Sequence, residues 1–200
     1  MKKKLLEIKD LEIGYQAKEQ KKVIQNHLNL SLHAGELICL IGPNGVGKST
    51  LLKTLGRIQP ELSGEIIIGD RSISEISQQE FSRKLALVLT EQLDIPHMSA
   101  KEVISLGRYP YTGFWGNLQG RDLSIVIKSA QNVGIEHLLN RAYIELSDGE
   151  KQKVLIAKAL AQQTPLMLLD EPTAFLDFPT KSSLLIMLRK LARQNQWESS

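Results

Sequence analysis

The chain has 200 residues, a length that suits one domain with a sizeable core. Hydrophobic residues make up 42% of it, which excludes a disordered chain, and its net charge of +3 is too small to indicate a nucleic-acid-binding protein. No stretch approaches the roughly 18 continuous apolar residues of a membrane span, and a single cysteine suits a reducing cytoplasm.

Short apolar segments predict strands at several points along the chain. Leucines alternate with polar residues over 28–33, a pattern typical of a half-buried strand. The apolar run 37–41 indicates a strand buried on both faces, with Cys39 as a small core residue within it. Further strands are expected over 65–68, 85–89 and 166–169.

Helical segments are expected between these strands. One helix is predicted over 49–55, directly after the second strand. Residues 100–140 show helical periodicity, interrupted at 107–120 by a segment rich in glycine and aromatic residues. Strands that alternate with helices indicate an α/β fold with a mostly parallel central sheet, and the middle region indicates a helical insert.

A phosphate-binding loop follows the strand predicted over 37–41. The pattern G-x-x-x-x-G-K-[ST] lets glycine N–H groups turn toward phosphate oxygens, and the next helix presents its N-terminus to the same anion. Lys48 would place a cation between the β- and γ-phosphates of ATP, and the Ser49 hydroxyl would coordinate Mg²⁺. The predicted ATP-binding residues are Gly42, Pro43, Asn44, Gly45, Val46, Gly47, Lys48, Ser49 and Thr50.

Two adjacent carboxylates, Asp170 and Glu171, follow the apolar run 166–169. An acid at the C-terminal end of a strand in an open parallel sheet points into the ligand crevice. Asp170 suits the water shell of Mg²⁺, and Glu171 is placed to polarise the attacking water.

These elements, in this order, resemble the ATP-binding-cassette (ABC) ATPase family over nearly the whole chain. Residues 146–150, Leu-Ser-Asp-Gly-Glu, resemble the signature motif that separates this family from other phosphate-loop proteins. The resemblance implies that Ser147 and Gly149 bind the γ-phosphate of ATP held by a second copy of the chain.

The signature motif also has a local interpretation. Ser147 and Glu150 form an S-x-x-E pattern, which predicts a capping box opening a helix toward Ala161. Asp148 and Glu150 stand where the family usually has glycine and glutamine. Their added negative charge is expected to weaken nucleotide-driven dimerisation.

Three further roles come from the resemblance. Tyr15 resembles the aromatic residue that stacks on adenine, although it also fits a tyrosine at a strand end. Gln92 resembles the glutamine that senses the γ-phosphate, binds the metal and contacts the membrane partner. Asp177 resembles the aspartate that communicates across the dimer, and it also fits an acid at a helix start.

The resemblance implies one ABC ATPase domain over residues 1–200, with an N-terminal antiparallel β part and a helical subdomain over about 95–160. Two copies would pack head to tail at the cytoplasmic face of the plasma membrane. Permease subunits would bind them there, a substrate-binding protein would act indirectly, and no nucleic acid is expected. The stretch 82–116 resembles importers of iron chelates, haem or cobalamin, as seen in residues 87–92 and 107–110.

Two alternatives remain open at this level. The family's switch histidine would follow the helix expected over 184–191, and the residues up to Ser200 have no strand pattern for it. A shortened cassette that binds ATP and hydrolyses it poorly is therefore one alternative. The other is a soluble ABC ATPase of translation or DNA repair, although such proteins usually carry tandem cassettes or long insertions.

Overall fold

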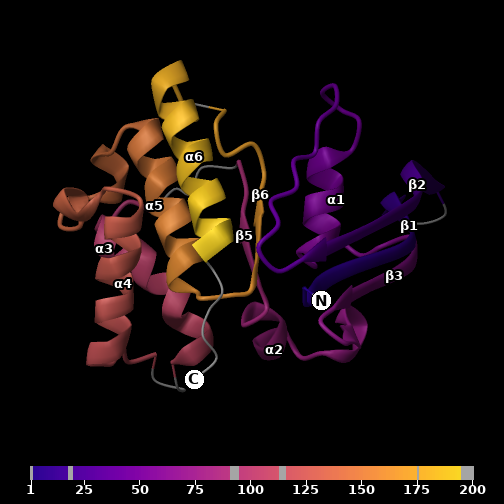
Figure 1. Cartoon of the computed structure of the whole chain (residues 1–200), viewed down its shortest axis with the longest axis horizontal. Coiled ribbons are helices and arrows are strands. Elements are labelled where there is room, and N and C mark those ends of the chain that lie inside the picture. Colours follow the sequence, from indigo (N-terminus) through magenta and orange to yellow (C-terminus); the bar gives the residue numbers. More distant parts are fainter. Residues whose placement is uncertain (1, 18–19, 91–94, 113–115, 175, 195–200) are drawn as a thin grey trace. The chain divides into compact units, whose positions relative to one another are not determined.

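The computed structural model describes residues 2–17, 20–90, 95–112, 116–174 and 176–194 (Figure 1). The chain forms two units, each with its own core. The first comprises Met1–Leu85 with Leu188–Ser200, and the second comprises Ala86–Met187.

An antiparallel sheet organises the first unit, in the strand order β2-β1-β3-β4. On β1, Leu6 lies opposite Ile68 and Ile8 lies opposite Ile66, and all four side chains are buried. Aliphatic pairs across neighbouring strands stabilise such a sheet. The sheet is the N-terminal antiparallel part that the resemblance implied. Its strands are β1 (Lys4–Ala17), β2 (Gln20–His33), β3 (Ser63–Ile68) and β4 (Arg71–Ser72).

Three helical segments accompany this sheet. Helix α1 (Lys48–Leu55) confirms the helix predicted over 49–55 and buries Leu52 and Leu55. The leucines of β2 are half-buried and alternate with exposed polar residues, as the pattern over 28–33 predicted. The short segments η1 (Ile73–Glu75) and α2 (Gln78–Ser82) follow β4.

The prediction of a buried strand over 37–41 is wrong. These residues form no strand, and their side chains are exposed, with Ile41 at 95%. Cys39 is likewise exposed, so its interpretation as a core residue is wrong too. An apolar run is buried as a strand only when other strands pair with its edges, and 37–41 belongs to neither sheet that the structure describes.

Strand β5 (Leu85–Val88) enters the second unit at Ala86 and pairs there with β6 (Leu166–Leu169). The backbone N–H of Asp170, just after β6, donates to the carbonyl of Val88 at the end of β5 at 2.9 Å. Since the carboxyl ends of both strands meet, the strands run parallel. Both strands predicted over 85–89 and 166–169 are confirmed.

Helices make up most of the second unit between these strands. Helix α5 packs against both α3 and α4, and its residues Val154, Ile156, Ala157 and Ala161 are completely buried. The break expected over 107–120 contains a 3-10 helix. The elements are α3 (Ala100–Ser105), η2 (Leu106–Tyr111), α4 (Gly120–Asn132), η3 (Glu136–Leu138), η4 (Tyr143–Glu145) and α5 (Asp148–Ala161).

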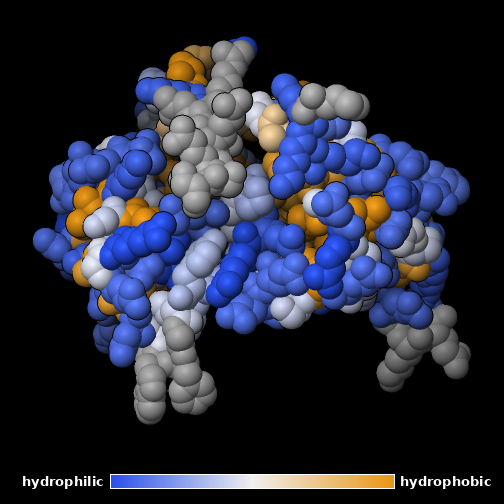
Figure 2. Space-filling view, turned by 60° about the horizontal axis from the view of Figure 1, so that its bottom comes forward, coloured by the Kyte–Doolittle hydropathy of each residue, from blue (hydrophilic) through white to orange (hydrophobic). Residues whose placement is uncertain are grey.

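The last element is α6 (Phe178–Gln194), which includes the helix expected over 184–191. Across the residues that the structure describes, none of the helices is long and apolar enough to cross a membrane. Hydrophilic side chains cover most of the face seen in Figure 2, with smaller hydrophobic areas between them.

Candidate functional site

The backbone of the phosphate loop depends on its glycines. Gly45 and Gly47 have φ values of +80° and +106°, in the region that favours glycine. A Cβ added to Gly47 would lie 2.7 Å from the Cγ2 atom of Ile24. Gly47 is also the N-cap of α1, and it has no side chain to occupy the N–H groups of the first turn. The first turn of α1 therefore has no side-chain cap from Gly47, and the positive end of the helix dipole lies at the loop, as in anion-binding helix N-termini.

Lys48 folds back over the loop. Its Nζ donates to the carbonyls of Gly42 and Pro43, both at 2.9 Å. The amide of Gln25, from β2, supports the loop by donating to the carbonyl of Val46 at 3.1 Å. These bonds hold the Lys48 ammonium against the backbone of the loop.

Tyr15 lies beside this loop, and its role in stacking on adenine stays a prediction. It comes from β1, and its hydroxyl lies 3.3 Å from Oγ1 of Thr50 in α1. The residue is 52% exposed, which leaves part of its ring surface accessible. The structure thus brings Tyr15 together with the last residue of the predicted loop.

Asp170 and Glu171 lie in the second unit, directly after β6. Asp170 is buried, its N–H is bonded to β5, and its carbonyl accepts a hydrogen bond from the hydroxyl of Thr90 at 3.0 Å. Glu171 is exposed and has a φ of +45°. A glutamate in this left-handed region is uncommon, and such backbone strain often marks a functional position.

The predicted capping box is present at the start of α5. The hydroxyl of Ser147 accepts a hydrogen bond from the N–H of Glu150 at 3.3 Å. One carboxylate oxygen of Glu150 accepts from the N–H and the hydroxyl of Ser147, at 2.8 and 2.9 Å. These two bonds are the main reason why the pKa of Glu150 is lowered. The signature segment therefore begins with a tightly bonded helix N-terminus.

Gly149 and Asp177 belong to the same unit as Ser147. A Cβ added to Gly149 would lie 3.0 Å from Cδ2 of Leu176, so the packing there is close. Asp177 accepts a hydrogen bond from the N–H of Thr180 at 3.2 Å at the start of α6. Hydrogen bonds from Thr180, first from its hydroxyl, lower the pKa of Asp177. This matches an acid at a helix start, and the role across a dimer stays a prediction.

The remaining predictions concern Gln92 and the metal. Gln92 lies outside the described residues. Among the residues that are described, no three His, Cys, Asp or Glu side chains gather as a metal site. A nucleotide-bound Mg²⁺ requires only one or two protein oxygens beside phosphate and water. The hydroxyl of Ser49 in the first unit is an oxygen ligand of this kind, and so, taken by itself, is the carboxylate of Asp170 in the second unit.

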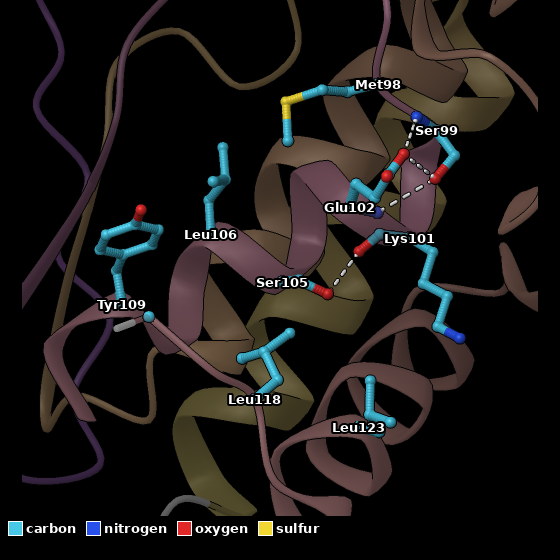
Figure 3. Close-up of a pocket in the computed structure, with 10 residues that line it drawn as sticks. Met98, Ser99, Lys101, Glu102, Ser105, Leu106, Tyr109, Leu118 and Leu123 are labelled. Carbon is cyan, nitrogen blue, oxygen red and sulfur yellow. Dashed lines mark hydrogen bonds between the residues drawn. The ribbon is translucent and has the colours of Figure 1, made fainter. Parts of the chain in front are cut away.

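A pocket of about 490 Å³ lies in the helical part of the second unit (Figure 3). Its apolar lining comes from Met98, Leu106, Leu118, Leu123 and the aromatic ring of Tyr109. Mostly apolar pockets with a few polar groups are typical contact sites for other molecules.

The sequence did not predict that Arg108 is buried and connects neighbouring helices. Arg108 lies in the segment 107–110, which resembles the importer class, and it is buried and bonded to Asp122 of α4 and to the carbonyl of Ala161 in α5. Its neighbour Gly107 lies against α5, since an added Cβ would be 2.2 Å from the carbonyl oxygen of Lys158. No periodic signal marks such a residue, because charged side chains are normally exposed.

The family model and the similar sequences all indicate the same protein family. The family model described as ABC transporter matches residues 25–174. An uncharacterised ABC transporter ATP-binding protein of Methanocaldococcus jannaschii is 41% identical over 94% of this chain and 63% of its own length. The iron(3+)-hydroxamate import ATP-binding protein of Bacillus subtilis is 35% identical over 94% of this chain and 69% of its own length.

A solved structure that is similar to this chain belongs to the same family. An ATP-binding cassette dimer in a post-hydrolysis state, bound to ADP and Pi, is similar with a TM-score of 0.81 and 27% identity. The match covers 94% of this chain and 83% of that chain. The chain thus spans about two thirds of the length of the two relatives described above.

Proposed function

The chain belongs to the ABC transporter family, and on this premise we propose that it binds and hydrolyses ATP to drive import across a membrane. The observation that carries the proposal is the phosphate loop. Its glycine backbone, open helix N-terminus and inward-held Lys48 form a site for a triphosphate. Tyr15 would stack on adenine beside this loop, where its hydroxyl bond to Thr50 holds it.

Each residue of the site has a role that follows from its chemistry. Lys48 would exchange its bonds to the loop carbonyls for phosphate oxygens, which are stronger acceptors because they are charged. Mg²⁺, held by Ser49 and Gln92 and through water by Asp170, would neutralise charge on the β- and γ-phosphates. Glu171 would accept a proton from the attacking water.

The ATP site would be completed by a second copy of the chain. Ser147 and Gly149 at the start of α5 would bind the γ-phosphate held by the partner copy, and Asp177 would lie near the same interface. The similar cassette, which is dimeric with ADP and Pi, supports this arrangement. Binding of ATP would close the dimer, and hydrolysis would reopen it.

The cargo class is proposed from the relatives. The B. subtilis relative imports iron(3+)-hydroxamate, so we assign this chain to the importers of iron chelates, with haem or cobalamin as related cargoes. Permease subunits would carry the cargo across the membrane. A substrate-binding protein would act with the permease and contact this chain only indirectly. The chain would bind the permease peripherally at the cytoplasmic face of the membrane, and the apolar pocket near Tyr109 supports such a contact.

The proposal is tested by replacing Lys48. Lys48→Ala should weaken ATP binding by at least about 100-fold, because charge-assisted hydrogen bonds worth roughly 3 kcal/mol in total are lost. Isothermal titration calorimetry measures this affinity. Lys53→Ala, in the last turn of the same helix, is the matched control and should bind ATP normally. Wild-type affinity in the Lys48 variant would refute the assignment of the loop.

A further inference from the structure

The N-terminus of α5 already binds a carboxylate of its own chain. Both donors of Ser147, its N–H and its hydroxyl, are bonded to the same oxygen of Glu150, at 2.8 and 2.9 Å. A hydroxyl has one hydrogen to donate. The Ser147 hydroxyl therefore cannot donate to a phosphate oxygen while it donates to Glu150.

Charge adds to this competition. Glu150 is an anion at the point where the proposed function places the γ-phosphate of the partner copy. Two negative charges within a few ångströms repel each other most strongly where water is excluded, as in a closed dimer interface. The Glu150 carboxylate and the γ-phosphate thus compete for the hydroxyl hydrogen of Ser147, and their negative charges repel each other.

An alternative partner for Glu150 lies close by. The guanidinium of Arg141 is 3.9 Å from the carboxylate oxygen that is not bonded to Ser147. Arg141 is itself anchored by a hydrogen bond to the carbonyl of Glu145 at 3.2 Å. A small rotation of the Glu150 side chain would exchange the capping bonds for a closer ion pair.

We propose that Glu150 is a positioning residue that restrains Ser147, and that the γ-phosphate displaces it toward Arg141 when two copies close on ATP. This inference rests on the proposed function, since it assumes that Ser147 acts on ATP of the partner copy. It implies that dimer formation includes the cost of opening the capping box at each site.

The chain offers a matched control for this inference. Helix α3 begins with the same capping box, in which Glu102 accepts from the N–H and the hydroxyl of Ser99, both at 2.7 Å (Figure 3). The N–H of Glu102 donates back to the Ser99 hydroxyl at 3.3 Å, as Glu150 does to Ser147. Replacing each glutamate by glutamine therefore makes the same change in two capping boxes, and only one belongs to the signature segment.

The experiment compares Glu150→Gln with Glu102→Gln. Glutamine retains the shape and can still form a capping box, yet it removes the charge and can leave the serine hydroxyl free to donate. Both variants are made in a Glu171→Gln background, which is expected to retain bound ATP. The ATP-driven dimerisation constant is measured by sedimentation, and monomer affinity for ATP by calorimetry at a concentration below dimerisation.

The expected result is specific to Glu150. Glu150→Gln should tighten the dimer by at least about tenfold, because one unit of repulsive charge is removed at each site. Monomer affinity for ATP should stay unchanged, and Glu102→Gln should alter neither quantity. An unchanged or weakened dimer in the Glu150 variant would overturn the inference, as would an equal gain in both variants. If the Glu171→Gln parent binds ATP and does not dimerise, the proposed trans site fails and the inference fails with it.

Discussion

Tyr143 places a phenol hydroxyl inside the core of the second unit. Its side chain is 1% exposed, and its hydroxyl has no hydrogen-bond partner among the residues that the structure describes. Burial raises the pKa of Tyr143, and the nearby charge of Asp148 raises it further, so the group stays protonated. An unpaired buried hydroxyl costs stability because it has lost its bonds to water.

Replacing this tyrosine by phenylalanine tests that cost. Tyr143→Phe should leave the free energy of unfolding unchanged or raise it by about 1 kcal/mol, since the ring packing is kept and only the unpaired hydroxyl is removed. Tyr143→Ala, in contrast, should lower it by roughly 3–5 kcal/mol through the cavity that it creates. Urea denaturation measures both values. A clear loss of stability in the phenylalanine variant would mean that the hydroxyl is bonded.

At the scale of elements, Arg108 connects three helical segments. It lies in η2, its Nε bonds to Asp122 of α4 at 2.9 Å, and its NH1 bonds to the carbonyl of Ala161 at the end of α5 at 2.7 Å. The guanidinium also lies 4.1 Å from the centre of the Tyr111 ring. One cation thus satisfies a C-terminal carbonyl of α5 and a carboxylate that caps α4.

This connection predicts a pH dependence of stability. The N–H of Gln119 and the side chain of Arg108 lower the pKa of Asp122 below its ordinary value of 3.8. The folded state therefore binds fewer protons than the unfolded state, and the stabilisation is present above pH 3.8 and lost as pH falls through the lower, folded-state pKa. Asp122→Asn should be less stable than wild type at pH 7, with a difference that shrinks in acid. Urea unfolding at several pH values measures this, and a constant difference would contradict it.

At the scale of the whole molecule, the proposed ATP site combines parts of two copies. Lys48 belongs to the first unit, and Ser147 belongs to the second. If Ser147 acts on the partner's ATP, a variant of either residue should be rescued by a variant of the other.

Mixing tests this arrangement directly in hydrolysis-competent protein. A Ser147→Arg chain and a Lys48→Ala chain should each be inactive, and their mixture should regain part of the ATPase activity. The heterodimer retains one site in which both Lys48 and Ser147 are intact. Each variant alone at equal total concentration is the control. No recovery, despite heterodimers detected by crosslinking, would count against action in trans.

Much of the fold could be predicted from the sequence, because β3, β5, β6 and α1 have clear apolar patterns and boundaries. Strand β1 was implied only by the family resemblance. Its buried residues are Leu6 and Ile8, then Leu11 and Ile13, with a shift in register between them near Asp10, which has a φ of +46°. An irregularity of this kind breaks the alternation that identifies a strand.

Parts of the candidate site could likewise be predicted from the sequence, and other parts could not. The phosphate loop and the Ser147 capping box were predicted because fixed spacings encode local backbone geometry. The bond between Tyr15 and Thr50, and the cluster around Arg108, join residues far apart in the sequence. Such contacts depend on tertiary packing, which no local pattern in a single sequence encodes.

Helix α5 is held mainly at its C-terminal end, so a small tilt of the helix produces its largest displacement at the other end. Its fourteen residues span about 21 Å at 1.5 Å per residue. Arg108 and the close approach of Gly107 hold its C-terminal end, and Ser147 lies at the other end. A tilt of about 5° around the held end would move Ser147 by about 2 Å, more than the length tolerance of a hydrogen bond. If Ser147 binds the γ-phosphate of the partner copy as proposed, a tilt of α5 this small would be sufficient to form or break that contact.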